Sequence, residues 1–434
     1  MRFVKQIALL LAACLLAGCS ASPLASDVET LLRAPQLSGQ TGAVQGALNR
    51  YLGVTATLRY PTRGEFLSPF LFGDWDGDGE NEAAVLYTSD TSPNVCLAIL
   101  EPDGTDWQVT QTVEGLSSEV EIITTAHLRD ADSTQLLVGY TSAQGDRFLV
   151  VYLYSDNALQ QILSQQYTQM LLADVTGSDE TQDLVLALPT EVENGGVTLN
   201  LLTNTPDGFR SAQTLNVGEG DYSGCAALHA STNAEGEPWL VMDGWTSAAR
   251  NSLATSIITY DSETGFLGTY YPEGVSASTL RRSTLRYDPA LISTDIDGNG
   301  TIDIPMELDD GGILTKPMDS RLKFLLWQDY STPEGGNACF GIYDAEYRFF
   351  LPLPDSMRGH VSVRSNASGT GWIICNETST RLYCELRIVD PADAGGEGYV
   401  RVATIGSQQL QFREVNHYRG LDVSALQTGV VLFE

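Results

Sequence analysis

A group of short apolar runs recurs along this chain, and the repetition limits the possible folds more than any other feature of the sequence. The segment DWDGDGENEAAVL at 74–86 aligns without a gap with DVTGSDETQDLVL at 174–186, and another loop of this kind, DIDGNGTID, occupies 295–303. Three weaker copies begin near His127, Ala227 and His360. The units recur about every 50 residues early in the chain and about every 60 later, the length that four strands and their turns require.

The segments between these loops predict strands. Short runs rich in Val, Ile, Leu, Thr and Tyr are broken by Gly, Asp, Asn and Pro, which is typical of an all-β chain, and no further helix is expected after Gly53. One four-stranded sheet cannot bury both of its faces, whereas sheets stacked around an axis can. We therefore predict a six-bladed β-propeller, or seven blades if the terminal segments form one, with 55–60 and 429–434 pairing to close the ring. An open pair of β-sandwiches is the alternative.

The start of the chain resembles a bacterial lipoprotein signal. Arg2 and Lys5 precede an apolar core at 7–16, which is too short to span a bilayer. The Leu-Ala-Gly-Cys segment that follows resembles a lipobox, which implies lipid on Cys19 and an extracytoplasmic location anchored to the cell membrane. An ordinary secretory signal is the alternative. The predicted domains are a signal peptide at 1–18, a tether at 19–40, a helix (41–52) and lead-in strand within 41–60, and the propeller at 61–434.

The charge of the chain limits its partners. Asp and Glu number 55 against 24 Lys and Arg, which gives a net charge of −31 at pH 7. Nucleic acid is excluded as a partner because its phosphates require a basic surface. Strong acidity instead favours divalent cations as companions.

The cysteines do not indicate a disulfide framework. Apart from Cys14 and Cys19 in the signal, five remain: Cys96, Cys225, Cys339, Cys375 and Cys384. Their odd number and wide spacing are typical of small buried side chains. A pairing of Cys375 with Cys384 across a hairpin stays open.

The loop at 74–82 carries an acid at every second position: Asp74, Asp76, Asp78, Glu80 and Glu82. Like charges this close repel each other unless a cation lies among them. The two glycines of the loop permit a sharp turn, so that the aspartates can converge while the ninth residue, Glu82, closes the shell and the carbonyl of Glu80 points inward. A site with only oxygen ligands favours calcium. A solvated turn without metal is the alternative.

An EF-hand does not fit this spacing. Its loop ends in an acid at the twelfth position, but the twelfth residues here are Val85 and Met306. Both loops instead carry an acid at the ninth position, Glu82 and Asp303, and strands flank them. The segment LFGDWDGDGENEAAV resembles the calcium loops of FG-GAP and VCBS repeats, found in integrin α-subunit propellers and bacterial surface proteins. The resemblance covers about residues 65–410 as a repeat pattern, and two loops carry the full motif.

This resemblance implies two calcium sites. The first would use the side chains of Asp74, Asp76, Asp78 and Glu82 and a backbone contact at Glu80; the second would use Asp295, Asp297, Asn299 and Asp303 and a backbone contact at Thr301. The weaker copies at Asp130 and Ala234 are expected to be plain turns.

The loop that starts at Asp174 departs from the motif. Thr176 and Ser178 replace two carboxylates, and Gln182 stands at the ninth position with Asp183 beside it. Whether this loop binds metal is left open by the sequence.

No catalytic residue is predicted. The four histidines, His127, His229, His360 and His417, are scattered singly, although three of them fall near the start of a unit and could meet at one rim of the ring. The chain has no G-x-S-x-G elbow and no phosphate-binding loop. The six tryptophans are expected to pack between blades, and the alternative that one or two of them line a binding face stays open. The sequence favours a binding or scaffold protein for a protein or glycan ligand; the alternatives are a polysaccharide lyase or hydrolase on the same fold and an envelope assembly factor.

Overall fold

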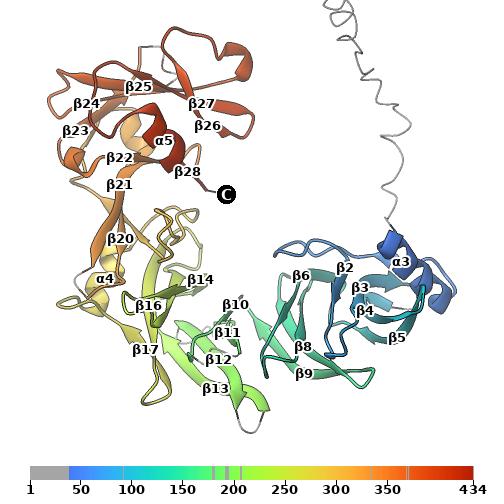
Figure 1. Ribbon diagram of the computed structural model, residues 1–434. Coiled ribbons are helices and arrows are strands. Elements are labelled where there is room, and N and C mark those ends of the chain that lie inside the picture. The colour runs from blue at the N-terminus through green and yellow to red at the C-terminus, as the bar shows by residue number, and fades with distance from the viewer. Residues whose placement is uncertain are drawn as a thin grey trace, which may run out of the picture.

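The described residues form six sheets whose main strands follow one another along the chain, and all strand pairs are antiparallel except β19 with β23 in the sixth sheet. The computed structural model describes residues 39–90, 92–177, 181–190, 195–205, 208–333, 335–367, 369 and 371–433. Figure 1 shows the sheets in an arc, and in the second, third and fourth sheets the first strand lies on the inner side and the last strand on the outer side. The prediction of an all-β, propeller-like fold is confirmed, and the sheets number six.

Each sheet contains a meander of neighbouring strands. The first sheet contains β1 (Thr57–Leu58), β2 (Phe70–Gly73), β3 (Glu82–Ser89), β4 (Ser92–Asp103) and β5 (Asp106–Glu114). The second contains β6 (Glu119–Ala126), β7 (Gln135–Thr141), β8 (Arg147–Ser155) and β9 (Ala158–Tyr167), and the third contains β10 (Gln169–Ala173), β11 (Asp183–Ala187), β12 (Val197–Thr205) and β13 (Gly208–Val217).

The fourth sheet contains β14 (Gly224–Thr232), β15 (Pro238–Trp245), β16 (Leu253–Asp261) and β17 (Phe266–Tyr270). The fifth contains β18 (Ile304–Leu308), β20 (Leu322–Asp329), β21 (Gly336–Asp344), β22 (Phe349–Leu353) and β28 (Val431–Leu432). The sixth contains β19 (Ile313–Leu314), β23 (Val361–Ser365), β24 (Gly371–Asn376), β25 (Leu382–Val389), β26 (Val400–Ile405) and β27 (Gln408–Glu414).

The inner strands explain why the sheets stack. Successive side chains of a strand point to opposite faces of its sheet. On β7, Leu136 and Val138 pack into the core shared with the first sheet, whereas Leu137 packs into the core shared with the third. Strands β11 and β15 alternate in the same way between the cores on their two sides. Each of these strands is buried on both faces, so neither face is stable without a neighbouring sheet.

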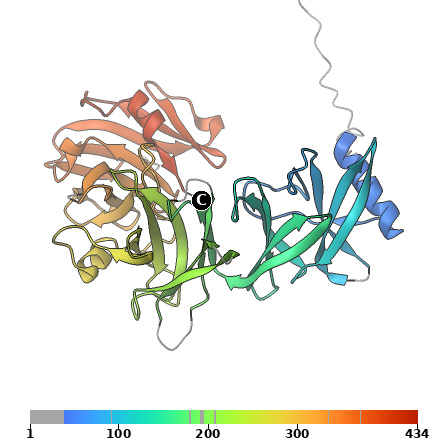
Figure 2. The same ribbon diagram turned by 60° about the horizontal axis from the view of Figure 1, so that its bottom comes forward.

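The two ends of the arc are covered differently. Helix α3 (Gly39–Leu52), predicted at 41–52, packs Val44 and Leu48 onto the outer face of the first sheet. On the sixth sheet, the guanidinium carbons of Arg387 and Arg413 lie 3.8 and 4.9 Å from the centre of the Tyr399 ring, so polar and aromatic groups cover its outer face. In Figures 1 and 2, α3 and the sixth sheet lie at opposite ends of the molecule.

The terminal strands do not pair with each other as predicted. Strand β1 pairs with β3 in the first sheet, and β28 pairs with β22 in the fifth. No core cluster of the described residues combines the first and sixth sheets. The prediction was wrong because both segments are short apolar runs, and such runs carry no information about which strand edge they will meet.

Two short helices were missed by the sequence analysis. They are α4 (Ala277–Ser283) and α5 (Val423–Gly429), and three 3₁₀ turns, η1 (Met318–Ser320), η2 (Asp355–Met357) and η3 (Pro391–Asp393), accompany them. Ser276 caps α4 and Asp422 caps α5, but each helix buries only one leucine, Leu280 or Leu426. Seven residues with one buried leucine give no helical periodicity that a sequence reader can detect.

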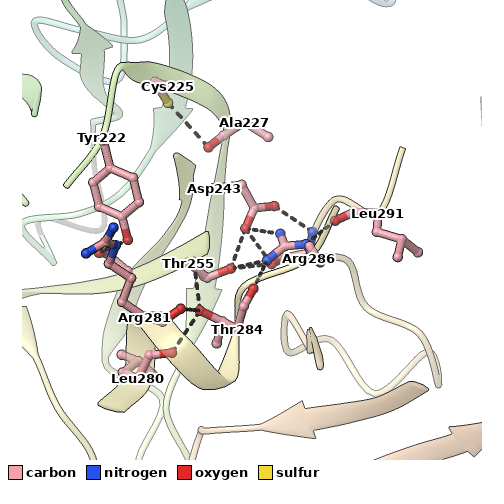
Figure 3. A network of polar contacts seen from close by, with 12 residues as sticks. Tyr222, Cys225, Ala227, Asp243, Thr255, Leu280, Arg281, Thr284, Arg286 and Leu291 are labelled. Atoms are coloured by element: carbon pink, nitrogen blue, oxygen red, sulfur yellow. Dashed lines mark hydrogen bonds and ion pairs between the residues drawn. The ribbon is translucent and has the colours of Figure 1, made fainter. Parts of the chain in front are cut away.

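A buried ion pair fastens the fourth sheet to the segment that leads into the fifth. Figure 3 shows Asp243 of β15 beside Arg286, whose Nη2 lies 2.6 Å from a carboxylate oxygen, and neither side chain is exposed to solvent. Thr255 donates a hydrogen bond to Asp243 at 2.6 Å, and the backbone N–H of Ser293 donates another at 2.6 Å. Burial by itself would raise the pKa of Asp243, but Arg286 and these hydrogen bonds outweigh it and hold the pKa below its usual value.

The five predicted structural cysteines are all free in the described part of the chain. Cys339 is half-buried, and the other four are buried. None of the helices among the described residues is both long and apolar enough to cross a membrane. The predicted signal peptide, Cys19 and most of the tether lie outside the described residues.

Candidate metal centres

In both full acidic loops, the residue before the loop pairs with the ninth residue of the loop. Gly73, the last residue of β2, pairs with Glu82, the first residue of β3. In the fifth unit, Thr294 forms an isolated antiparallel bridge with Asp303. The intervening eight residues must therefore reverse direction within a narrow space, which explains why glycines stand in the middle of each loop.

The first aspartate of each loop organises the turn. The two carboxylate oxygens of Asp74 accept hydrogen bonds from the N–H groups of Gly77 at 2.7 Å and Gly79 at 3.0 Å. Asp295 accepts the matching bonds from Gly298 at 2.7 Å and Gly300 at 2.9 Å. All four glycines have positive φ values between 78° and 92°. The two loops thus reach the same geometry although they stand far apart in the sequence.

The predicted side-chain ligands converge in both loops. Ligand oxygens of Asp74, Asp76, Asp78 and Glu82 lie within 4.8 Å of one another, and so do those of Asp295, Asp297 and Asp303. Asn299 lies beside them, and its side-chain oxygen accepts a hydrogen bond from the Thr301 N–H at 2.7 Å. The Glu80 N–H donates to Asp78 at 2.8 Å in the equivalent turn. The structure therefore brings together the predicted carboxylates of each site.

The ninth residue of each loop is a buried carboxylate. Glu82 accepts a hydrogen bond from the Trp75 N–H at 2.8 Å, and Asp303 accepts one from the Ile296 N–H at 3.1 Å. Burial, reinforced by the other carboxylates of each loop, raises the pKa of Glu82 to about 7 and that of Asp303 to about 7. Because burial penalises the charged form, these two acids are poorly accommodated as bare anions.

The chemistry of the donor set fits a hard cation. Each cluster offers oxygen atoms only, and the second oxygen of Asp303, Oδ1, is buried without a hydrogen-bond partner. A buried acceptor without a partner costs free energy, and a cation between the carboxylates would remove that cost together with their mutual repulsion. The two clusters could therefore hold a metal ion.

The loop that starts at Asp174, called the third loop because it belongs to the third sheet, has an acid at the same structural position, which the gapless alignment misplaced. Ala173 pairs with Asp183, as Gly73 pairs with Glu82, so the loop is one residue longer than its counterpart. Asp183 is fully buried, and its Oδ2 accepts hydrogen bonds from the N–H groups of Val175 and Thr176 at 2.9 and 2.8 Å. Ser178 lies outside the described residues. An alignment anchored on the acid that begins the apolar strand would have found Asp183.

The second unit keeps this arrangement with a neutral side chain. Gln135 begins β7, is fully buried and accepts a hydrogen bond from the Leu128 N–H at 2.6 Å. Its amide nitrogen donates to the Ser133 hydroxyl at 2.9 Å, a contact that a carboxylate could not make. Among the described residues, no metal-ligating cluster is found in this loop or in the loop at Ala234. Gln135 was not singled out in the sequence, because a single glutamine before an apolar run carries no pattern.

The histidines do not gather at one rim. The ring Nδ1 of His127 lies 3.2 Å from the Ser133 carbonyl oxygen, His229 lies within β14, and the ring Nδ1 of His360 is 3.5 Å from a Glu377 carboxylate oxygen. No metal-ligating cluster of the described residues includes a histidine.

Comparisons with known proteins do not assign a family. No protein-family model and no curated protein matches this chain. Among solved structures, an exotype rhamnogalacturonan lyase has a TM-score of 0.20 and 13% identity over 56% of this chain and 59% of that enzyme, less than two thirds of its length. A rhamnogalacturonan lyase from Bacillus licheniformis has a TM-score of 0.31 and 9% identity over 74% of each chain. A protein from Bacteroides uniformis proposed to be a 6-phosphogluconolactonase has a TM-score of 0.31 and 10% identity over 78% of this chain and 92% of that one. At these TM-scores we draw no conclusion about a substrate or a reaction.

Proposed function

We propose that this chain is an extracytoplasmic, lipid-anchored module in which calcium braces two loops of a propeller related to FG-GAP and VCBS repeats. The observation that carries the proposal is the matched pair of loops, in which Asp74 and Asp295 make the same hydrogen bonds and the buried Glu82 and Asp303 close each cluster. The Leu-Ala-Gly-Cys segment that ends at Cys19 supports the lipid anchor.

Calcium fits these clusters better than magnesium or zinc. Calcium takes six to eight oxygen ligands in a flexible arrangement, whereas magnesium demands a tighter octahedron and retains several waters. Zinc prefers nitrogen and sulfur ligands, and no histidine or cysteine joins either cluster in the described ranges. Carboxylates on successive turns of a glycine-rich loop supply the adaptable oxygen shell that calcium requires.

The expected energies indicate a structural ion and not a switch. Extracellular calcium modules bind with a Kd of about 0.1–1 mM. At about 1 mM calcium, each site then stabilises the fold by about 0.4–1.4 kcal/mol. This is enough to order a loop, but it is too little to drive a rearrangement of packed sheets.

A calcium titration of thermal unfolding tests the proposal. We expect calcium to raise the Tm of the mature protein by about 0.5–1.5 °C per site relative to chelator. Asp74→Ala and Asp295→Ala are each expected to lose part of this increase, and Asp390→Ala, outside both clusters, is expected to keep all of it. A Tm that responds to neither chelator nor these two substitutions would refute the calcium assignment.

The propeller is proposed to act by binding a protein or glycan at the cell surface, without turning it over. The alternative, a polysaccharide lyase or hydrolase, requires an acid and a base that face one bound glycan. Incubation with polysaccharide panels followed by product analysis separates the two, because release of shorter saccharides would establish the enzyme.

A further inference from the structure

The loops of each sheet lie at the two opposite ends of its strands, and we call these two ends the edges of the sheet. In an antiparallel meander, the turn after the first strand and the turn after the third strand lie at one edge, and the turn after the second strand lies at the other with the connection to the next sheet. The loop at 74–82 follows β2, and the loop at 295–303 follows Thr294, whose isolated bridge to Asp303 takes the place of a first strand; both loops therefore lie at the first edge, the acidic edge. We call the opposite edge the connection edge. The two edges carry different chemistry.

A polar cavity opens at the connection edge of the second, third and fourth sheets. It measures about 600 Å³, and residues from all three sheets line it, among them Arg147, Gln169, Thr190 and Trp245. A second cavity of about 180 Å³ shares Arg147 and Gln169 with the first and extends to Arg63. We name the two together the connection groove. Its main cavity falls within the range of about 300–1,000 Å³ that is typical of ligand sites.

A buried glutamate holds two arginines at the inner end of the groove. Glu121 of β6 has a side chain that is only 8% exposed. Its carboxylate lies 2.9 Å from Arg63 Nη1 and 3.2 Å from Arg147 Nε, and the Tyr167 hydroxyl donates to it at 3.0 Å. A side chain at Gly139 could not fit, because a Cβ there would lie 2.5 Å from the Tyr167 hydroxyl oxygen. One carboxylate thus orients two guanidinium groups and leaves a net positive charge.

Two inner strands depart from regular pairing at the groove. The register of β6 shifts between Val120 and Ile122, so Glu121 is the extra residue, and the register of β14 shifts between Cys225 and Ala227, so Ala226 is the extra residue. The bulge frees the Ala226 carbonyl, which accepts a hydrogen bond from Gln169 at 2.6 Å. Register shifts occur in other sheets as well, but these two change the direction of groups that line the groove, as bulges can do.

The groove also holds donors that the fold does not use. Neither the indole N–H of Trp245 nor the guanidinium of Arg250 has a partner among the described residues. Arg250 is exposed and adopts a φ of 53°, a left-handed conformation that costs free energy for a residue other than glycine. Three arginines, Arg63, Arg147 and Arg250, and two acids, Asp146 and Glu121, line the groove, so it carries one excess positive charge in a chain with a net charge of −31.

We propose that the connection groove binds an oligosaccharide that carries carboxylates, a uronic acid oligomer; this rests on the proposed function as a binding module. Arginine pairs with carboxylate through two parallel hydrogen bonds, which supplies the charge recognition. The amides of Gln144 and Gln169 and the hydroxyl of Thr190 match sugar hydroxyls, and the Trp245 ring offers a flat apolar surface to a sugar face. An acidic peptide would satisfy the arginines but would leave the hydroxyl-matching groups without partners.

Calorimetry on the mature full-length protein tests this inference with three probes: a galacturonic acid trisaccharide, its neutral methyl ester and a triglutamate peptide. We expect the trisaccharide to bind and the other two to bind at least about 10-fold more weakly. Arg250→Gln removes the guanidinium that has no partner and keeps a side chain of similar length. It is expected to weaken trisaccharide binding about 10- to 100-fold. The matched control is Arg401→Gln, an exposed arginine on β26 outside the groove, and it is expected to bind like wild type.

Each outcome decides between the proposals. Equal binding of the methyl ester, tighter binding of the peptide, or an Arg250→Gln variant that binds like wild type would overturn the groove assignment. If no saccharide binds while calcium still raises the Tm, the groove inference fails and the calcium proposal stands. If the trisaccharide binds through Arg250 while calcium has no effect, the groove stands and the calcium proposal fails.

Discussion

Asp243 and Asp303 are both fully buried aspartates, yet the charges that surround them are opposite. Asp243 has Arg286 at 2.6 Å and a low pKa, because the counter-charge is part of the chain. Asp303 has other carboxylates as neighbours, one oxygen without a hydrogen-bond partner and a pKa raised to about 7. The fourth sheet therefore carries its own cation, whereas the described acidic loops contain no counter-charge of their own and could hold an ion from solution.

The difference shows what each arrangement provides. A built-in ion pair fixes the joint between two sheets under all conditions in which both groups are charged. A carboxylate cluster without a built-in cation makes the order of its loop depend on the surrounding ion concentration. Breaking each arrangement should therefore have effects of different size and different dependence on calcium and pH.

The largest effect is expected at the buried pair. Asp243→Ala leaves the Arg286 charge buried and unpaired, which costs about 3–5 kcal/mol of unfolding free energy. Urea unfolding with and without calcium measures it, and the loss should be the same in both conditions. Combining Asp243→Ala with Arg286→Met should recover part of the loss, because no unpaired charge then remains. An unchanged urea midpoint in the single variant would show that the pair is dispensable.

A smaller effect, which depends on pH, is expected at the acidic loops. The folded pKa of Glu82 and Asp303 is about 7, above the usual 4.5 and 3.8, so the folded state binds protons that the unfolded state has released. In chelator, the contribution of these two groups to stability should be fully present below about pH 4, fall as the pH rises toward 7 and be lost above it. Calcium should flatten this dependence, because it neutralises the same carboxylates.

The substitution Glu82→Gln sharpens this test. An amide does not titrate, so the decline of Tm with rising pH in chelator should become shallower. The control is Glu263→Gln, an exposed glutamate outside both clusters, and it should follow the wild-type curve. If the Tm of Glu82→Gln fell with rising pH as steeply as that of the wild type, titration of the Glu82 carboxyl would not be the cause of the decline.

The smallest effect is expected at the exposed pair between α3 and β5. Arg50 Nη2 lies 2.6 Å from the Asp106 carboxylate, but the two side chains are 60% and 57% exposed. Water and salt screen such a pair, so Asp106→Ala should not measurably move the urea midpoint. A shift comparable with that of Asp243→Ala would contradict the view that burial decides the strength of these pairs.

Much of the acidic loops could be read from the sequence, because the information is local. Asp74, Asp76, Asp78 and Glu82 stand on one short loop, and the glycines between them permit only a tight turn. The third loop shows the limit of that reading. Its alignment without a gap selected Gln182, whereas strand pairing places Asp183 opposite Ala173. Register depends on the neighbouring strand, and a loop sequence does not contain it.

Residues that meet from distant segments of the chain could not be found in this way. Glu121 meets Arg63 and Arg147, which come from segments 58 and 26 positions away in the chain. Asp243 meets Arg286 across 43 positions. No spacing rule links such residues, because the distance between them is set by strand pairing and by the path of the connecting segments.

The sequence alone determined the all-β composition of the chain, its division into repeated units, the position of α3 and the carboxylates of two loops, because periodicity, glycine placement and loop chemistry act over a few residues. Only the tertiary structure decided how the ends of the arc are covered, which acid serves the third loop, which arginine neutralises Asp243 and where polar groups line a groove. These features depend on contacts between distant segments, and such contacts form only when each sheet buries its faces against its neighbours.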